Sequence, residues 1–551
     1  MNIINKILPF MGWKSNVKPN LKVDIIAGLT VALVLIPQSM AYAQLAGMPP
    51  YYGLYAALLP GIIAILWGSS SHLATGPVAM TSLLTASILA PFVTDGDMTK
   101  YIHLAIILAF LVGIIRVIVG VCKLTFLVNF LSQPVIRGFI NAGALIIGVS
   151  QISKMFGIKM NSTGWFLRDI CDVFANISHT HLPTLIIGVV SVLIIILLKK
   201  YAPKVPSALI VMIFSILTVY LFNLSAPKDV LNSGGQYVSI IGEIPKGLPK
   251  FALPQFSLYT TEMLQLIPGA IMVMFIGFME VCSVTKAISI NSKEKIDLNQ
   301  ELIGQGLSAI GGSFTQCYPT SGSFSRSALN YSSGAKTGMS AIFTGIFVIV
   351  TLLCLTDYLF YLPDAALAAI IIMAVAGLID FKMMFYSWKV SKLDGIASIT
   401  TFVASIWLAP NIVNGIIIGT ILSIVFHLFK TMKPKFIIEH ISDEVSTLKF
   451  DGQIYFANSA YFESKIESIC EERKNIKRIV VMGEGINAID ATGENMLKEL
   501  ITNLRNDNIE LVFEGLKEQV YKTFKRGDFY EFATEKSFYK TKELALNLNS
   551  K

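Results

Sequence analysis

Long apolar runs, separated by short polar segments, occupy the chain from about residue 24 to residue 432. A helix needs about 20 apolar residues to cross the hydrocarbon core of a bilayer, and fewer if it is broken. On that measure the pattern predicts fourteen membrane-spanning segments. After Pro434 short strand-like and helix-like stretches alternate, which predicts a small α/β domain.

Two of the predicted segments are interrupted by glycine, proline and hydroxyl residues. The third contains Gly76-Pro77, and the tenth contains Gly322 followed by Ser323 and Arg326. These residues favour an extended chain that gives way to a helix, whose first N–H groups have no intrahelical partner. Interrupted segments in corresponding positions of two halves are typical of transporter sites and predict a 7+7 inverted repeat.

An anion site is predicted where these half-helices begin. A helix N-terminus favours negative charge, and Ser323, Ser325 and Arg326 would add hydroxyl and guanidinium donors. In the first segment Gln38 and Tyr42 lie four residues apart and therefore share one helix face. They either offer polar groups to the site or bind a neighbouring helix, and the residues leave both interpretations open.

Glu280 lies inside the predicted eighth segment, where an ionised carboxylate is costly. We interpret it as a proton carrier rather than a structural ion pair, with Arg326 as its partner. Two further arginines, Arg116 and Arg137, are expected at helix ends, close to lipid headgroups.

Composition and charge agree with a membrane protein. The 551 residues are 54% hydrophobic and 15% charged, with a mean hydropathy of +0.63. The net charge of +8 comes largely from lysines between apolar runs, which indicates cytoplasmic N- and C-termini rather than a nucleic-acid partner. The six scattered cysteines and the pair His179 and His181 do not predict a metal site, and no cofactor is expected.

The predicted domains are a cytoplasmic N-terminal segment (1–23), a transmembrane transporter domain (24–432) and a cytoplasmic α/β domain (433–551). The last contains no P-loop, no GxGxxG and no catalytic triad, so enzyme activity is not expected.

Several stretches together resemble the SulP family of sulfate permeases and related anion transporters along the whole chain. The matching stretches in the transporter domain are Leu35–Ala43, Ala74–Ala79, Asn299–Gln305 and Gly322–Ser327, and those in a C-terminal domain that resembles a STAS domain are Gly452–Asn458 and Gly485–Gly493.

The resemblance implies core and gate domains, a homodimer, and substrate held between the third and tenth segments. It implies substrate-binding roles for Gln38, Tyr42, Val78, Ala79, Ser323, Ser325 and Arg326. Glu280 and Arg326 match an acid–base pair of proton-coupled sulfate carriers.

Two departures from family patterns matter. Sodium-coupled bicarbonate members carry a hydroxyl residue one turn after an acidic residue, whereas Val284 follows Glu280 at that spacing, so sodium coupling is not expected. In related STAS domains a phosphorylated serine follows the loop aspartate. Here Ala491 follows Asp490, and Thr492 is a candidate substitute.

These observations predict a multi-pass cell-membrane transporter that takes up sulfate or a similar oxyanion by proton symport. Transport or exchange of bicarbonate, dicarboxylate or chloride on the same scaffold remains an alternative. A membrane-anchored regulatory platform, recruiting a cytoplasmic protein through the STAS domain, is an alternative of another class.

Overall fold

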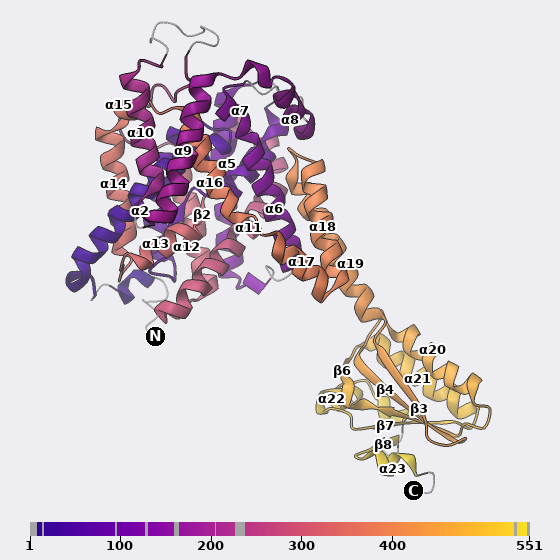
Figure 1. Cartoon of the computed structure of the whole chain (residues 1–551). Coiled ribbons are helices and arrows are strands. Elements are labelled where there is room, and N and C mark those ends of the chain that lie inside the picture. Colours follow the sequence, from indigo (N-terminus) through magenta and orange to yellow (C-terminus); the bar gives the residue numbers. More distant parts are fainter. Residues whose placement is uncertain are drawn as a thin grey trace. The chain divides into compact units, whose positions relative to one another are not determined.

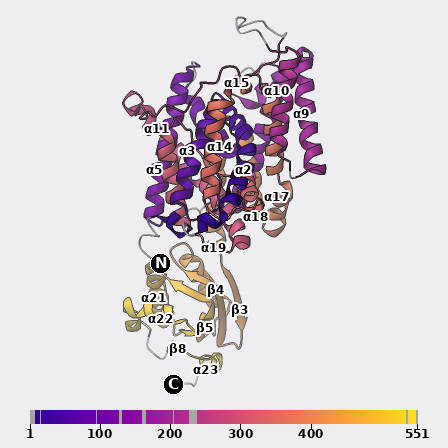
Figure 2. The same ribbon diagram turned by 90° about the vertical axis from the view of Figure 1, so that its left-hand side faces the viewer.

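The computed structural model describes residues 8–13, 16–93, 96–126, 131–158, 165–203, 205–225, 237–533 and 537–547. The chain divides into two compact units, Met1–Ile421 and Leu422–Lys551. The first is a bundle of helices and the second is an α/β domain built on one sheet (Figures 1 and 2). The domain boundaries that the sequence predicts, after residue 23 and after residue 432, are not tested by this division and stay predictions.

The helices of the first unit follow the predicted order, and the last of them continues into the second unit. They are α2 Val17–Leu45, α3 Tyr51–Trp67, α4 Ala79–Leu89, α5 Met98–Val121, α6 Gln133–Ser150, α7 Ile152–Phe156, α8 Phe166–Ala175, α9 Leu182–Tyr201, α10 Ser207–Leu221, α11 Thr260–Ser292, α12 Leu298–Ser313, α13 Phe324–Ser332, α14 Met339–Cys354, α15 Thr356–Leu359, α16 Asp364–Val375, α17 Phe381–Val390, α18 Lys392–Trp407 and α19 Ile412–Met432.

Each of the fourteen predicted segments contains a helix. Among the described residues, seven helical stretches are long and apolar enough to cross a bilayer, and α3, α4, α10 and α14 are shorter apolar helices. The predicted class of helical membrane protein is thus confirmed, while the number of crossings stays a prediction.

The helix packing has the exchanged pattern that an inverted repeat requires. The fourth predicted segment, α5, packs on α11 and α12, which begin the second half of the bundle. Its counterpart α14 packs on α2 and α3, which begin the first half (Figure 2). In the same way α6 packs on α18, while α16 packs on α9.

Small residues allow the closest of these contacts. A Cβ atom placed on Gly113 of α5 would lie 2.8 Å from the carbonyl oxygen of Gly306 on α12, and the reverse distance is also 2.8 Å. Helices in membranes associate through such close backbone approach because burial of apolar side chains gives no advantage over lipid.

The second unit contains a mainly parallel sheet of six strands in the order β3-β4-β5-β7-β8, with β6 paired to β4. Only the β3–β4 pair is antiparallel in the described sheet. The large core lies against α20, α21 and α22, and a small cluster with Ala545 of α23 covers the other face. The elements are β3 Lys435–His440, β4 Val445–Ile454, α20 Ser459–Glu472, β5 Arg478–Met482, β6 Ile486–Ile489, α21 Ala491–Asn506, β7 Glu510–Glu514, α22 Glu518–Arg526, β8 Phe538–Tyr539 and α23 Lys542–Leu546.

Candidate anion site

The two interrupted segments meet inside the first unit. Their extended parts form β1 (Thr75–Gly76) and β2 (Ser321–Gly322), which pair antiparallel with Thr75 opposite Gly322. The N–H of Ser323 donates to the carbonyl of Ala74 at 2.9 Å. Because α4 and α13 begin two or three residues after this pair, their N-termini lie close together, as the sequence predicts.

Arg326 joins the two half-helices. Its Nη2 donates to the carbonyl of Pro77 at 2.8 Å, and only 1% of its surface is exposed. Nε and Nη1 are buried without a hydrogen-bond partner among the described residues. A buried guanidinium with two unused donors is ready to bind an anion.

Further hydrogen bonds fix the extended chain against α13. Ser327 Oγ accepts from the N–H of Ala74 at 2.8 Å, and Asn330 Nδ2 donates to the carbonyl of His72 at 3.1 Å. The extended segment that leads into β1 and α4 is therefore held in place by side chains of α13.

The predicted binding residues gather around these helix ends, with one difference in exposure. Val78 and Ala79 are buried at the start of α4, where no side chain caps the helix. Ser323 is buried at the start of α13, and its Oγ accepts a 3.4 Å hydrogen bond from the N–H of Arg326. Ser325 is exposed, although its Oγ lies 3.4 Å from that of Ser323.

The first helix contributes Gln38 and Tyr42. Tyr42 is buried and interacts electrostatically with Arg326 and Glu280. Gln38 is partly buried, and its Oε1 has no partner among the described residues. No neighbouring helix in the described structure donates a hydrogen bond to Gln38 Oε1. This oxygen is therefore available to the candidate site.

The carboxylate of Glu280 does not form the predicted direct pair with Arg326. Its Oε2 is buried without a partner in the described part of the chain, and both Arg326 and Arg116 act on it electrostatically. The expected position of Arg116 at a helix end is wrong, because this side chain is 1% exposed and its Nη1 donates to Thr320 at 3.0 Å. Arg137 does lie at the surface, 3.8 Å from Asp380.

The spacing of small residues along α5 could have revealed the position of Arg116. Gly113 and Gly120 lie three and four residues from it and are buried on the same face. A stripe of glycines faces another helix more often than lipid, so an arginine in that stripe faces protein as well.

The sequence does not predict the hydrogen-bond network around Glu301 that supports β1. Its Oε2 accepts from the N–H groups of Ser69 and Ser70 at 2.8 and 3.0 Å. Gln305 Nε2 donates to Glu301 and, at 2.7 Å, to Thr75 Oγ1. This network anchors β1 and the residues before it to α12.

In the second unit, Asp490 caps α21. Its Oδ1 accepts from the N–H of Gly493 at 2.7 Å, and Oδ2 accepts from the N–H of Phe456 at 3.0 Å. Thr492 is exposed in the first turn of α21, accessible to a partner.

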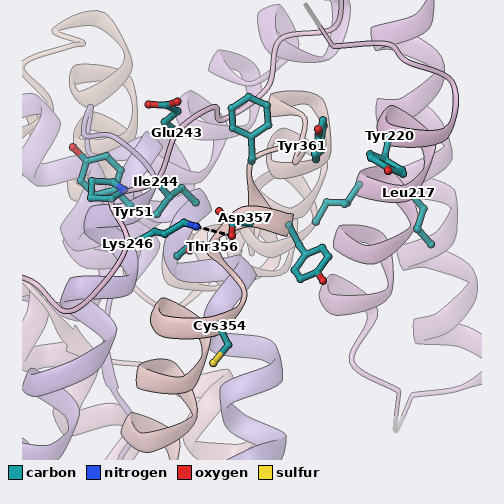
Figure 3. A pocket seen from close by; sticks show the side chains of 14 residues that line it. Tyr51, Leu217, Tyr220, Glu243, Ile244, Lys246, Cys354, Thr356, Asp357 and Tyr361 are labelled. Carbon is teal, nitrogen blue, oxygen red and sulfur yellow. Dashed lines mark hydrogen bonds and ion pairs between the residues drawn. The ribbon is translucent and has the colours of Figure 1, made fainter. Parts of the chain in front are cut away.

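A cavity of about 1170 Å³ lies apart from the helix ends, between α10 and the turn that joins α14 to α16 (Figure 3). Its lining includes Tyr51, Tyr220 and Tyr361, together with the ion pair of Lys246 and Asp357 at 2.8 Å. None of the predicted binding residues lines it. In the described residues no group of His, Cys, Asp and Glu side chains could hold a metal ion.

Comparison with known proteins shows the same two parts. The model of the sulfate permease family matches residues 21–401, and that of the STAS domain matches residues 437–545. "Sulfate transporter 4.1, chloroplastic" of Arabidopsis thaliana is 31% identical over 94% of this chain and 78% of its own length. "Sodium-independent sulfate anion transporter" of Bos taurus is 32% identical over 95% of this chain and 89% of its own.

Solved structures share the fold at lower identity. Murine Slc26a9, described as an anion transporter in the inward-facing state, has a TM-score of 0.87 at 22% identity, covering 97% of this chain and 92% of that one. The transmembrane domain of the cyanobacterial bicarbonate transporter BicA has a TM-score of 0.60 at 22% identity, covering 74% and 98%. With its family match over most of the first unit and a STAS domain behind it, the chain belongs to the sulfate permease family, whose members are transporters and not enzymes.

Proposed function

We propose that the protein is a secondary active transporter that takes up sulfate together with protons. The observation that carries this proposal is the pairing of β1 with β2, which brings two helix N-termini and the guanidinium of Arg326 to one buried place. Main-chain N–H groups and hydroxyls bind an oxyanion through hydrogen bonds, and none of these donors carries a full positive charge. Such binding suits a site that must also release its ligand.

The proposed binding residues are Gln38, Tyr42, Val78, Ala79, Ser323, Ser325 and Arg326. Glu280 is the proposed proton carrier. Its protonation removes a negative charge that acts on Arg326 and so raises the local positive potential, which favours anion entry. Loss of the proton at a higher cytoplasmic pH then favours release.

The cellular setting is part of the same proposal. The protein lies in the cell membrane as a homodimer with both termini in the cytoplasm, so residues 433–551 face the cytoplasm. Relatives of the whole chain include proteins named as sulfate transporters, which supports sulfate as the substrate. Exposed Thr492 beside the cap Asp490 is the proposed contact for a cytoplasmic protein.

Uptake of labelled sulfate into proteoliposomes tests this function. An inward proton gradient should stimulate uptake, while a sodium gradient of the same size should not, because Val284 replaces a hydroxyl side chain one turn after Glu280. Equal uptake with and without the proton gradient would contradict the proposed coupling.

Bicarbonate transport is the second candidate, because the BicA transmembrane domain shares the fold. Competition between labelled sulfate and bicarbonate in the same liposomes separates the two. Sulfate uptake that bicarbonate abolishes at a lower concentration than unlabelled sulfate would favour this second function.

A further inference from the structure

Arg116 is a second buried cation close to the proposed anion site. It projects from α5, which packs on α11 and α12 and carries none of the residues predicted to bind substrate. Only 1% of its surface is exposed, as for Arg326. Arginine keeps its charge in proteins, so this burial places a permanent positive charge in the interior.

The contacts of Arg116 place it beside both the anion site and Glu280. Its Nη1 donates to the carbonyl of Thr320, the residue immediately before β2. A Cβ atom on Gly277 would lie 2.6 Å from its Nη2, so the guanidinium rests against α11 at that glycine. Gly277 and Glu280 are three residues apart in one helix and share a face.

The guanidinium is poorly satisfied by the protein itself. Nε and Nη2 are buried without a hydrogen-bond partner among the described residues. Its one described hydrogen bond goes to a neutral carbonyl. A buried charge is costly unless it is paired, and these two donor nitrogens are free to bind an anion.

The charges around Glu280 then set the charge of the site. The groups that act on it are Arg116 from α5, Arg326 from α13 and Tyr42 from α2. Two guanidinium groups and one ionised carboxylate carry a net charge of +1. Protonation of Glu280 raises this to two, which matches a divalent oxyanion.

We propose that Arg116 is a specificity-determining residue that selects divalent over monovalent oxyanions, by supplying the second permanent positive charge of the site. This inference rests on the proposed anion site between α4 and α13. It assigns a role to a residue outside the two half-helices.

Competition by two anions of the same shape tests the inference. Selenate and perchlorate are both tetrahedral, but selenate carries two charges and perchlorate carries one. In proteoliposomes, we would measure the concentration of each anion that halves the uptake of labelled sulfate. The selectivity ratio is this concentration for perchlorate divided by that for selenate. Arg116→Gln should lower this ratio by about tenfold, because loss of one positive charge weakens the binding of a divalent anion more than that of a monovalent anion.

Two further variants make the test specific. Arg116→Lys keeps the charge and should hold the ratio within about threefold of wild type. Arg137→Gln removes an arginine at the surface of the same bundle, where it pairs with Asp380, and should leave the ratio unchanged. A purely structural role for Arg116 would reduce the amount of folded protein without changing this ratio.

The outcomes separate the inference from the function on which it rests. Wild-type protein that carries neither sulfate nor selenate would contradict the proposed function. Wild-type transport with an unchanged ratio in folded Arg116→Gln would overturn the inference alone. Should Arg116→Gln fail to fold, the neutral and flexible Arg116→Met decides: a lowered ratio in folded protein supports the inference, and an unchanged ratio overturns it.

Discussion

At the scale of single residues, unused polar atoms gather around the two helix ends. Gln38 Oε1, Glu280 Oε2, and two nitrogens each of Arg116 and Arg326 are buried without partners in the described structure. Each such atom costs about 1–3 kcal/mol relative to a satisfied one. Unpaired buried atoms also occur elsewhere in the described chain, for example Ser191 Oγ and Ser398 Oγ, so it is the gathering of charged groups at the two helix ends that supports an anion site here.

The first prediction concerns Glu280. Glu280→Gln keeps the shape of the side chain but holds no titratable proton, so sulfate uptake should continue while its stimulation by an inward proton gradient disappears. Uptake is measured in proteoliposomes at equal internal and external pH and again with the outside more acidic. Wild-type stimulation in the variant would contradict the role of Glu280.

The second prediction concerns the hydroxyl of Ser323. Ser323→Ala removes the cap of α13 and one proposed anion donor, and should weaken helix or protein stability by about 0.5–2 kcal/mol. It should also raise the sulfate concentration needed for half-maximal uptake.

Ser332→Ala at the other end of α13 is the matched control, since that exposed hydroxyl donates to Leu329 within its own helix. Thermal unfolding and uptake are measured for both variants. An equal change in half-saturation for the two would argue against anion binding by Ser323.

At the scale of elements, the sequence predicts the helices and the two helix starts around which the candidate site is built. The start of α13 beside Ser323 and the break at Gly76-Pro77 follow from local chemistry and are confirmed. The two-residue strands β1 and β2 could not be predicted, because so short a pair has no periodic signal. Arg116 was misplaced because the distance of a residue from the end of an apolar run does not tell which face it occupies.

The third prediction concerns the contact of α5 with α12. Gly113→Val places a side chain against Ile310 and the backbone of Gly306, and should lower the free energy of unfolding by about 1–3 kcal/mol. Gly377→Val is the control, because a Cβ atom there meets nothing within 4 Å. The midpoint of thermal unfolding in detergent is compared. Equal midpoints for both variants would show that close packing at Gly113 is dispensable.

At the scale of the whole molecule, the chain consists of a helical unit that holds the candidate site and an α/β unit with cores on both faces of its sheet. Short strand-like stretches in the sequence predict the strands of this second unit, apart from the short β6 and β8. The sequence does not reveal the pairing of β6 with β4, since parallel partners are distant along the chain.

The fourth prediction concerns this second unit. Residues 433–551 expressed alone should unfold cooperatively, because the sheet has its own core. Within it, burial raises the pKa of Glu514, and the nearby Glu484 adds to the increase. A raised carboxyl pKa means that the ionised form opposes folding, so stability falls as the pH rises through the ordinary carboxyl range and stays lower at neutral pH.

Glu514→Gln should therefore be more stable than wild type at pH 7, and the difference should vanish below about pH 4, where the carboxyl is protonated in both states. Urea unfolding at several pH values measures this. A variant that is less stable at pH 7 would contradict the assignment.

The position of the bound anion tests the central claim most directly. Selenate mimics sulfate, and its selenium gives an anomalous X-ray signal in crystals of the protein. The account predicts a peak within hydrogen-bond distance of main-chain N–H groups in the first turns of both α4 and α13. A peak elsewhere, or none at a selenate concentration that saturates inhibition of sulfate uptake, would contradict it.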